Sequence, residues 1–106
     1  MPWIILIVAG LLEVVWAYYM KQSHGFTRAI PTAITIVASL ASFGLLAVSM
    51  KTLPLGTAYM VWTGIGAVGA FAVGVAVLGE AVTVTRVIAA TLLIAGLVLM
   101  KFSSAA

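Results

Sequence analysis

The sequence predicts an all-α integral membrane protein in which four transmembrane helices form one domain over residues 1–106. Hydrophobic residues make up 65% of the chain and charged residues only 7%, whereas a soluble domain has roughly 25% charged residues. The apolar residues also fall into runs close to the ~20 residues that an α-helix needs to cross a bilayer. These runs lie at about 2–20, 30–50, 57–78 and 85–102.

The segments between these runs have the composition of turns. The first run lacks a basic segment before it and is longer than the apolar core of a signal peptide, so we expect it to be retained. Pro31 suits the first turn of the second helix, and Pro54 interrupts the chain before the third. Residues 79–83 form the last turn. Because no run alternates with period two and backbone groups must be satisfied internally in lipid, helices are predicted throughout.

The composition excludes several classes of function. The chain has no cysteine, which excludes disulfides and thiolate metal sites. Its formal net charge of +3 lies at the ends of the predicted helices and requires no nucleic-acid partner. No segment outside the helices is long enough for a soluble domain. We therefore expect the function to be carried out within the lipid bilayer, with no enzymatic activity, cofactor or metal site.

The distribution of Lys and Arg orients the chain only weakly. With four spans, Lys51 and Lys101 lie on one side of the membrane, and Lys21, Arg28 and Arg86 lie on the other. A difference of one charge is a weak instruction under the positive-inside rule. Two alternatives stay open. The chain inserts into the membrane in both orientations, or it modestly prefers the orientation with the first and third loops in the cytoplasm.

The size of the chain favours a dimer. Four helices barely surround a polar pathway, and transporters place the substrate between two repeats of inverted topology. Two copies inserted in opposite directions reproduce that arrangement, so we expect an antiparallel homodimer. The candidate dimer interface is a stripe on the fourth helix at i, i+4 and i+7, formed by Ala89, Leu93 and Gly96. Packing within one subunit is the alternative explanation of this stripe.

Glu13 is the most informative candidate residue. It is one of two carboxylates and lies inside the first apolar run, where an acidic side chain costs on the order of 3 kcal/mol. No Lys, Arg or His in the predicted spans pairs with it, so we interpret it as a site for cations and protons, which would exclude each other. Trp16, one turn away, is a candidate hydrogen-bond donor to it. The other carboxylate, Glu80, lies near Arg86 and is expected to be a solvated turn residue.

Residues of the second and third runs complete a candidate small-cation site. Tyr59 and Trp62 recur at helical spacing and offer aromatic faces, a phenol and an indole N–H. Ser42 lies on a polar stripe of the second helix. Such a set provides hydrogen-bonding groups around the carboxylate and cation–π contacts for a cation. The alternatives are that Tyr59 is an interfacial belt residue and that Ser42 bonds back to its own helix.

The segment from Gly64 to Gly69 spells G-x-G-x-x-G. A dinucleotide site would require a preceding strand and a following acidic residue in a βαβ unit, and neither is predicted here. We instead interpret Gly64 and Gly66 as positions of close helix packing and as a hinge in the third helix.

Three segments of the chain form a recognisable pattern. They are Glu13-Val-Val-Trp16-Ala, His24-Gly-Phe-Thr-Arg28 and Gly56-Thr-Ala-Tyr59-Met-Val-Trp62-Thr-Gly-Ile-Gly66. Together they resemble the small multidrug resistance family. The similarity covers essentially the whole chain. Tryptophan three residues after the glutamate and the Trp-Thr-Gly-Ile-Gly version of the third-helix motif are similar to the guanidinium-exporter subtype. Lipophilic-cation exporters of the family usually carry a small residue where Trp16 stands.

The resemblance implies a proton-coupled antiporter in the plasma membrane of a prokaryote, which exports guanidinium as an antiparallel homodimer of dual-topology subunits. It implies that Glu13 is the shared proton and substrate site. Its hydrogen-bonding shell would consist of Trp16, Ser42 and Trp62, and Tyr59 would contribute to binding and coupling.

Other functions remain as alternatives. The nearest is a multidrug exporter of quaternary ammonium or other lipophilic cations, against which Trp16 argues. A passive cation channel or a structural subunit that assembles with a paralogue is the second; the single intramembrane carboxylate and the bulky aromatics argue against a channel. Tyr18, Tyr19 and Met60 depart from the family pattern and leave the substrate range open.

Overall fold

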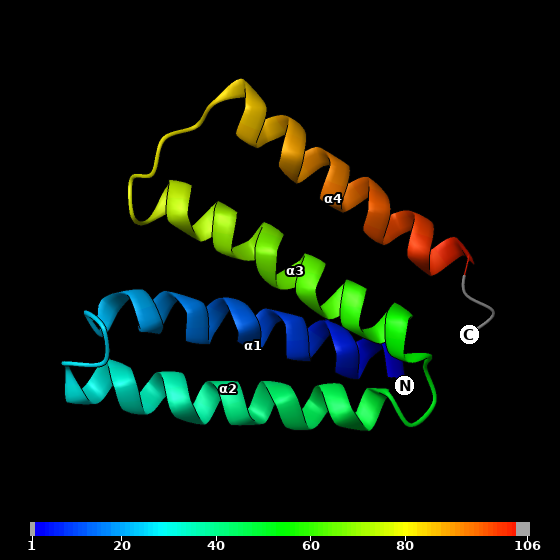
Figure 1. Ribbon diagram of the computed structural model, residues 1–106, viewed down its shortest axis with the longest axis horizontal. Helices are drawn as coiled ribbons and strands as arrows, with labels where there is room; N and C mark the ends of the chain where they lie inside the picture. The colour runs from blue at the N-terminus through cyan, green and yellow to red at the C-terminus, as the bar shows by residue number, and fades with distance from the viewer. Residues whose placement is uncertain (1, 104–106) are drawn as a thin grey trace.

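The computed structural model describes residues 2–103 and contains four α-helices joined by short loops (Figure 1). The helices are α1 (Pro2–Gln22), α2 (Ala29–Ser49), α3 (Leu55–Ala76) and α4 (Val84–Ser103). Each is long and apolar enough to span a membrane. The prediction of an all-α protein with four spanning helices is therefore confirmed, and no predicted end differs from the observed one by more than two residues. Residues 1 and 104–106 of the expected domain lie outside the described residues.

The four helices form an open arrangement that extends over 43 × 34 × 16 Å. Figure 1 looks down the shortest axis of the molecule and shows α1 between α2 and α3, with α4 along the outer side of α3. The start of α3 also reaches α2, since Trp62 forms a hydrogen bond to Ser42. Within residues 2–103, α4 packs on α3 and on neither α1 nor α2, so the chain does not close into a four-helix bundle.

The best-buried apolar residues gather where the start of α1 meets the end of α2 and the start of α3. They are Leu6, Ala9, Leu46, Leu53, Ala58, Val61 and Trp62. By contrast, α4 has no buried residue within its described range. The core therefore fixes α1, α2 and α3 to one another, whereas most of the surface of α4 is left for lipid or for another protein.

Glycines bring the backbones of neighbouring helices close together. A Cβ atom at Gly10 of α1 would lie 2.8 Å from Ile65 of α3, and one at Gly69 of α3 would overlap the side chain of Val14. Towards α4, a Cβ at Gly64 would lie 2.6 Å from Leu97. Since side chains would keep these helices apart, the contacts depend on glycine. The role of Gly64 as a hinge stays a prediction.

Candidate cation-binding site

Glu13 lies in the middle of α1 and points towards α3. A Cβ atom at Gly66 of α3 would overlap the carboxylate oxygen Oε1 of Glu13, so the carboxyl group rests directly on the glycine backbone. Oε1 is buried and has no hydrogen-bond partner among the described residues. A buried carboxylate without a partner is costly in its charged form. The position therefore favours either a proton or a bound cation on Glu13.

Ser42 connects three helices through two hydrogen bonds. Its hydroxyl group donates to the backbone carbonyl of Ala9 in α1 at 2.7 Å and accepts a hydrogen bond from Trp62 Nε1 in α3 at 3.0 Å. The alternative that Ser42 bonds back to its own helix is therefore wrong; its neighbour Ser39 does so, donating to the carbonyl of Ile36 at 2.9 Å. Ser42 thus fixes the orientation of the Trp62 indole.

Replacing Ser42 with alanine should destabilise the folded chain. The substitution leaves the buried indole N–H of Trp62 unpaired, which we expect to lower the free energy of unfolding by about 1–2 kcal/mol. Unfolding of the purified protein by sodium dodecyl sulfate, in mild-detergent micelles, measures this difference. Ser39→Ala is the matched control, since it removes a hydroxyl group bonded only within α2. Equal effects of the two substitutions would contradict the prediction.

Aromatic rings form a continuous row across α1, α2 and α3. The ring centroids of Trp16 and Phe43 are 6.3 Å apart, those of Phe43 and Trp62 are 5.8 Å apart, and those of Tyr59 and Trp62 are 5.8 Å apart. These separations are typical of favourable aromatic pairs. The row brings together three of the predicted site residues, and Phe43 joins Trp16 to the other two.

Phe43 was not among the predicted site residues, although it follows Ser42 directly. Phe43 is 48% exposed and Tyr59 is 53% exposed in the single chain, whereas Trp62 is buried. The row therefore runs from the core to an open face, and a cation on that face could contact aromatic rings. The alternative of an interfacial position for Tyr59 stays open.

The expected hydrogen bond from Trp16 to Glu13 is not present. The indole nitrogen of Trp16 is buried and has no acceptor within residues 2–103. Spacing of three residues places the two side chains on the same face of α1, but the ring of Trp16 instead packs edge-on against Phe43 of α2. The site thus contains an unpaired N–H donor and an unpaired carboxylate oxygen one helical turn apart on α1.

The electrostatic surroundings of Glu13 are sparse. Within the described part of the chain the one ion pair joins Arg86 to Glu80 at 3.3 Å, and both side chains are exposed. This agrees with the interpretation of Glu80 as a solvated turn residue. No described residue of the spans therefore offers Glu13 a permanent positive partner.

The stripe on α4 is only partly packed against the rest of the chain. Ala89, Leu93 and Gly96 are exposed, and a Cβ atom at Gly96 would meet nothing within 4 Å. Ala89 and Leu93 nevertheless line a cavity with Ala67 and Phe71 of α3. The alternative of packing within one subunit therefore stays open for these two residues, and the stripe as a dimer interface stays a prediction.

Comparison with known proteins gives a consistent relationship. The family profile described as Small Multidrug Resistance protein matches residues 1–94. A guanidinium exporter from Yersinia pseudotuberculosis serotype I (strain IP32953) is 54% identical over 104 residues, covering 98% of this chain and 100% of the relative. Guanidinium exporters from Citrobacter freundii and Salmonella typhimurium (strain LT2) are 52% and 53% identical, covering 98% of this chain and 99% of each relative.

Proposed function

Because this chain belongs to the small multidrug resistance protein family, we propose that it exports guanidinium and small guanidinyl cations in exchange for protons. It is a multi-pass protein of the bacterial cell membrane. The relatives that match along nearly their whole length are named guanidinium exporters, which are transporters and not enzymes. The observation that carries the proposal is the buried, unpartnered carboxylate oxygen of Glu13.

Exchange follows from competition at this carboxyl group. Burying an isolated carboxylate costs free energy, and binding of either a proton or a cation to the carboxylate removes this cost. The two cannot occupy the same oxygen atoms together. If the site changes its side of exposure only when protonated or loaded, inward proton flow drives outward cation flow. Guanidinium binding should then weaken as the pH falls, by up to about tenfold per pH unit for one competing proton.

The groups around Glu13 suit a planar cation with several N–H donors. A guanidinium ion can donate two parallel hydrogen bonds to a carboxylate and lay its face on an aromatic ring. In our proposal Trp16, Ser42 and Trp62 form the shell of Glu13, and Tyr59 closes the row of rings towards the open face. A quaternary ammonium ion lacks N–H donors and would use only the charge and the aromatic faces.

A second copy of the chain completes the transport pathway in this proposal. Because α4 packs on α3 alone among the described residues, and the helices do not close into a bundle, one chain offers only one wall of a cavity. An antiparallel partner of opposite topology would supply the other wall, with a second Glu13 facing the same space. The stripe of Ala89, Leu93 and Gly96 on α4 is exposed and is the proposed contact between the two copies.

Proteoliposomes test this function. The purified protein is reconstituted, a pH gradient is imposed, and the movement of guanidinium and of tetraethylammonium is followed in parallel. We expect guanidinium to accumulate against its gradient and tetraethylammonium to move little. Movement of tetraethylammonium alone would instead support the multidrug exporter that the family description suggests. A conductance without proton coupling would contradict both.

A further inference from the structure

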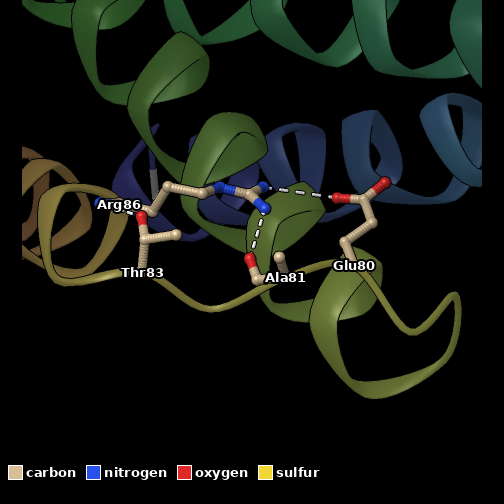
Figure 2. A network of polar contacts seen from close by, with 4 residues as sticks. All are labelled: Glu80, Ala81, Thr83 and Arg86. Carbon is tan, nitrogen blue, oxygen red and sulfur yellow. Dashed lines mark hydrogen bonds and ion pairs between the residues drawn. The ribbon is translucent and has the colours of Figure 1, made fainter.

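Three different contacts hold the guanidinium group of Arg86 where the loop between α3 and α4 meets the end of α3. Arg86, in the first turn of α4, donates from Nη1 to the backbone carbonyl of Ala81 and from Nη2 to Glu80 Oε1 at 3.3 Å, as Figure 2 shows. Its Cζ atom also lies 4.9 Å from the ring centroid of Phe71 in α3. A carboxylate, a carbonyl oxygen and an aromatic face therefore surround one planar cation.

Contacts other than those with Arg86 hold these groups in place. The backbone N–H of Glu80 donates to the carbonyl of Gly74 at 3.0 Å, and a Cβ atom at Gly74 would overlap the Glu80 carboxylate, which therefore rests against the end of α3. Gly79 turns the chain with a φ of 69°. The hydroxyl oxygen of Thr83 accepts the backbone N–H of Arg86 at 3.1 Å and caps α4. Removing the Arg86 side chain would leave these contacts intact.

The same arrangement would recognise a free guanidinium ion. Its N–H donors lie in one plane and match carboxylate and carbonyl oxygens, while its face stacks on an aromatic ring. An ammonium ion has no such plane. The site is distinct from Glu13, since its oxygen ligands come from the loop and its ring from the end of α3.

The Arg86 head group is held loosely enough to exchange. The side chains of Arg86 and Glu80 are 39% and 41% exposed, and ion pairs of that exposure contribute little stability. Both residues line a cavity of about 400 Å³ between α1 and α3. Along α1 the lining of this cavity extends from Lys21 to Val14, the residue after Glu13. A cation that leaves the site formed by Glu80 and Phe71 would therefore enter the outer end of this cavity.

We propose that Glu80, the Ala81 carbonyl and Phe71 form a peripheral binding site for free guanidinium, which the side chain of Arg86 fills when the cation is absent. A tethered competitor acts at an effective concentration in the millimolar range, so the site fills only at high guanidinium concentration. That guanidinium is the physiological ligand of this site rests on the proposed function. Whether guanidinium binds to the site can be measured independently of transport.

The two carboxylates of the chain make a direct test possible. Only Glu13 and Glu80 carry side-chain carboxyl groups, so Glu13→Gln leaves the Glu80 carboxylate as the one glutamate signal in protein labelled with ¹³C at the glutamate carboxyl carbon. The full chain in lipid bicelles is titrated with guanidinium chloride, and with potassium chloride at equal ionic strength. We expect a saturable shift of the Glu80 resonance with guanidinium alone.

Variants of Arg86 distinguish binding at this site from a general effect of salt on the Glu80 resonance. Adding Arg86→Ala to the Glu13→Gln protein should lower the half-saturating concentration by up to about fivefold, because the weakly held tethered competitor is gone. Arg86→Lys keeps the charge and should act in the same direction. Arg28→Ala removes a charge from the first loop and should change nothing. A shift that does not saturate, that potassium reproduces, or that neither Arg86 variant strengthens would overturn the proposal, whether or not the protein transports guanidinium.

Discussion

Glu13→Gln is expected to abolish gradient-driven guanidinium transport completely. The amide keeps the shape of the side chain, but it carries no charge for the cation and takes up no proton. Loss of charge-assisted hydrogen bonds of about 1.5–3 kcal/mol predicts a 10- to 100-fold weaker affinity for guanidinium. Because coupling requires a group that releases its proton when the cation binds, transport should fall to the level of empty liposomes.

Calorimetry and flux measurements on the same preparations check this result. Glu13→Asp is the informative companion variant, since it keeps the carboxyl group but shortens its reach by one methylene. We expect it to bind guanidinium more weakly and still to lose affinity as the pH falls. If the glutamine variant binds guanidinium with the affinity of the native protein, or if native binding does not change with pH, Glu13 is not the shared site.

Gly66→Ala should be nearly as damaging, although it adds one methyl group. That methyl group would occupy the position of the Glu13 carboxylate. Either the carboxyl group must turn away or α1 and α3 must separate, and such overpacking costs about 1–3 kcal/mol. If the cost falls mainly on the bound state, guanidinium transport should decrease by roughly 10- to 100-fold.

Gly44→Ala is the matched control for this substitution. Gly44 also lies within a spanning helix, but a Cβ atom there would meet nothing within 4 Å. Transport by this variant should match the native protein, and both variants should unfold at similar denaturant concentrations if the effect of Gly66 is local. Native activity of Gly66→Ala would show that the close contact between Glu13 and the glycine is dispensable.

The helices were predictable from the sequence because bilayer thickness fixes their length and lipid fixes their composition. Glu13 could be singled out for the same reason, since a charge inside an apolar run is conspicuous. The connections between helices were not predictable in this way. The hydrogen bonds of Ser42 to Ala9 and Trp62 depend on how α2 and α3 lie beside α1, and helical spacing within one span does not contain that information.

The predicted hydrogen bond from Trp16 to Glu13 is absent for a related reason. Spacing by three residues shows which side chains share a face of a helix, but the direction of an indole N–H depends on the neighbouring helix against which the ring packs. Here that neighbour is Phe43 on α2. Similarly, Gly66 was expected to serve packing or bending, and its contact with the Glu13 carboxylate depends on the crossing of α1 and α3.

The exposed surface of α4 also bears on how the stability of the protein should be measured. A helix without a buried residue over its described range packs against lipid or against another copy, so the surroundings contribute to the native state. By mass action, the population of an assembled form then depends on how many copies share a given area of bilayer. Melting temperatures of this protein will have meaning only at a stated ratio of protein to lipid.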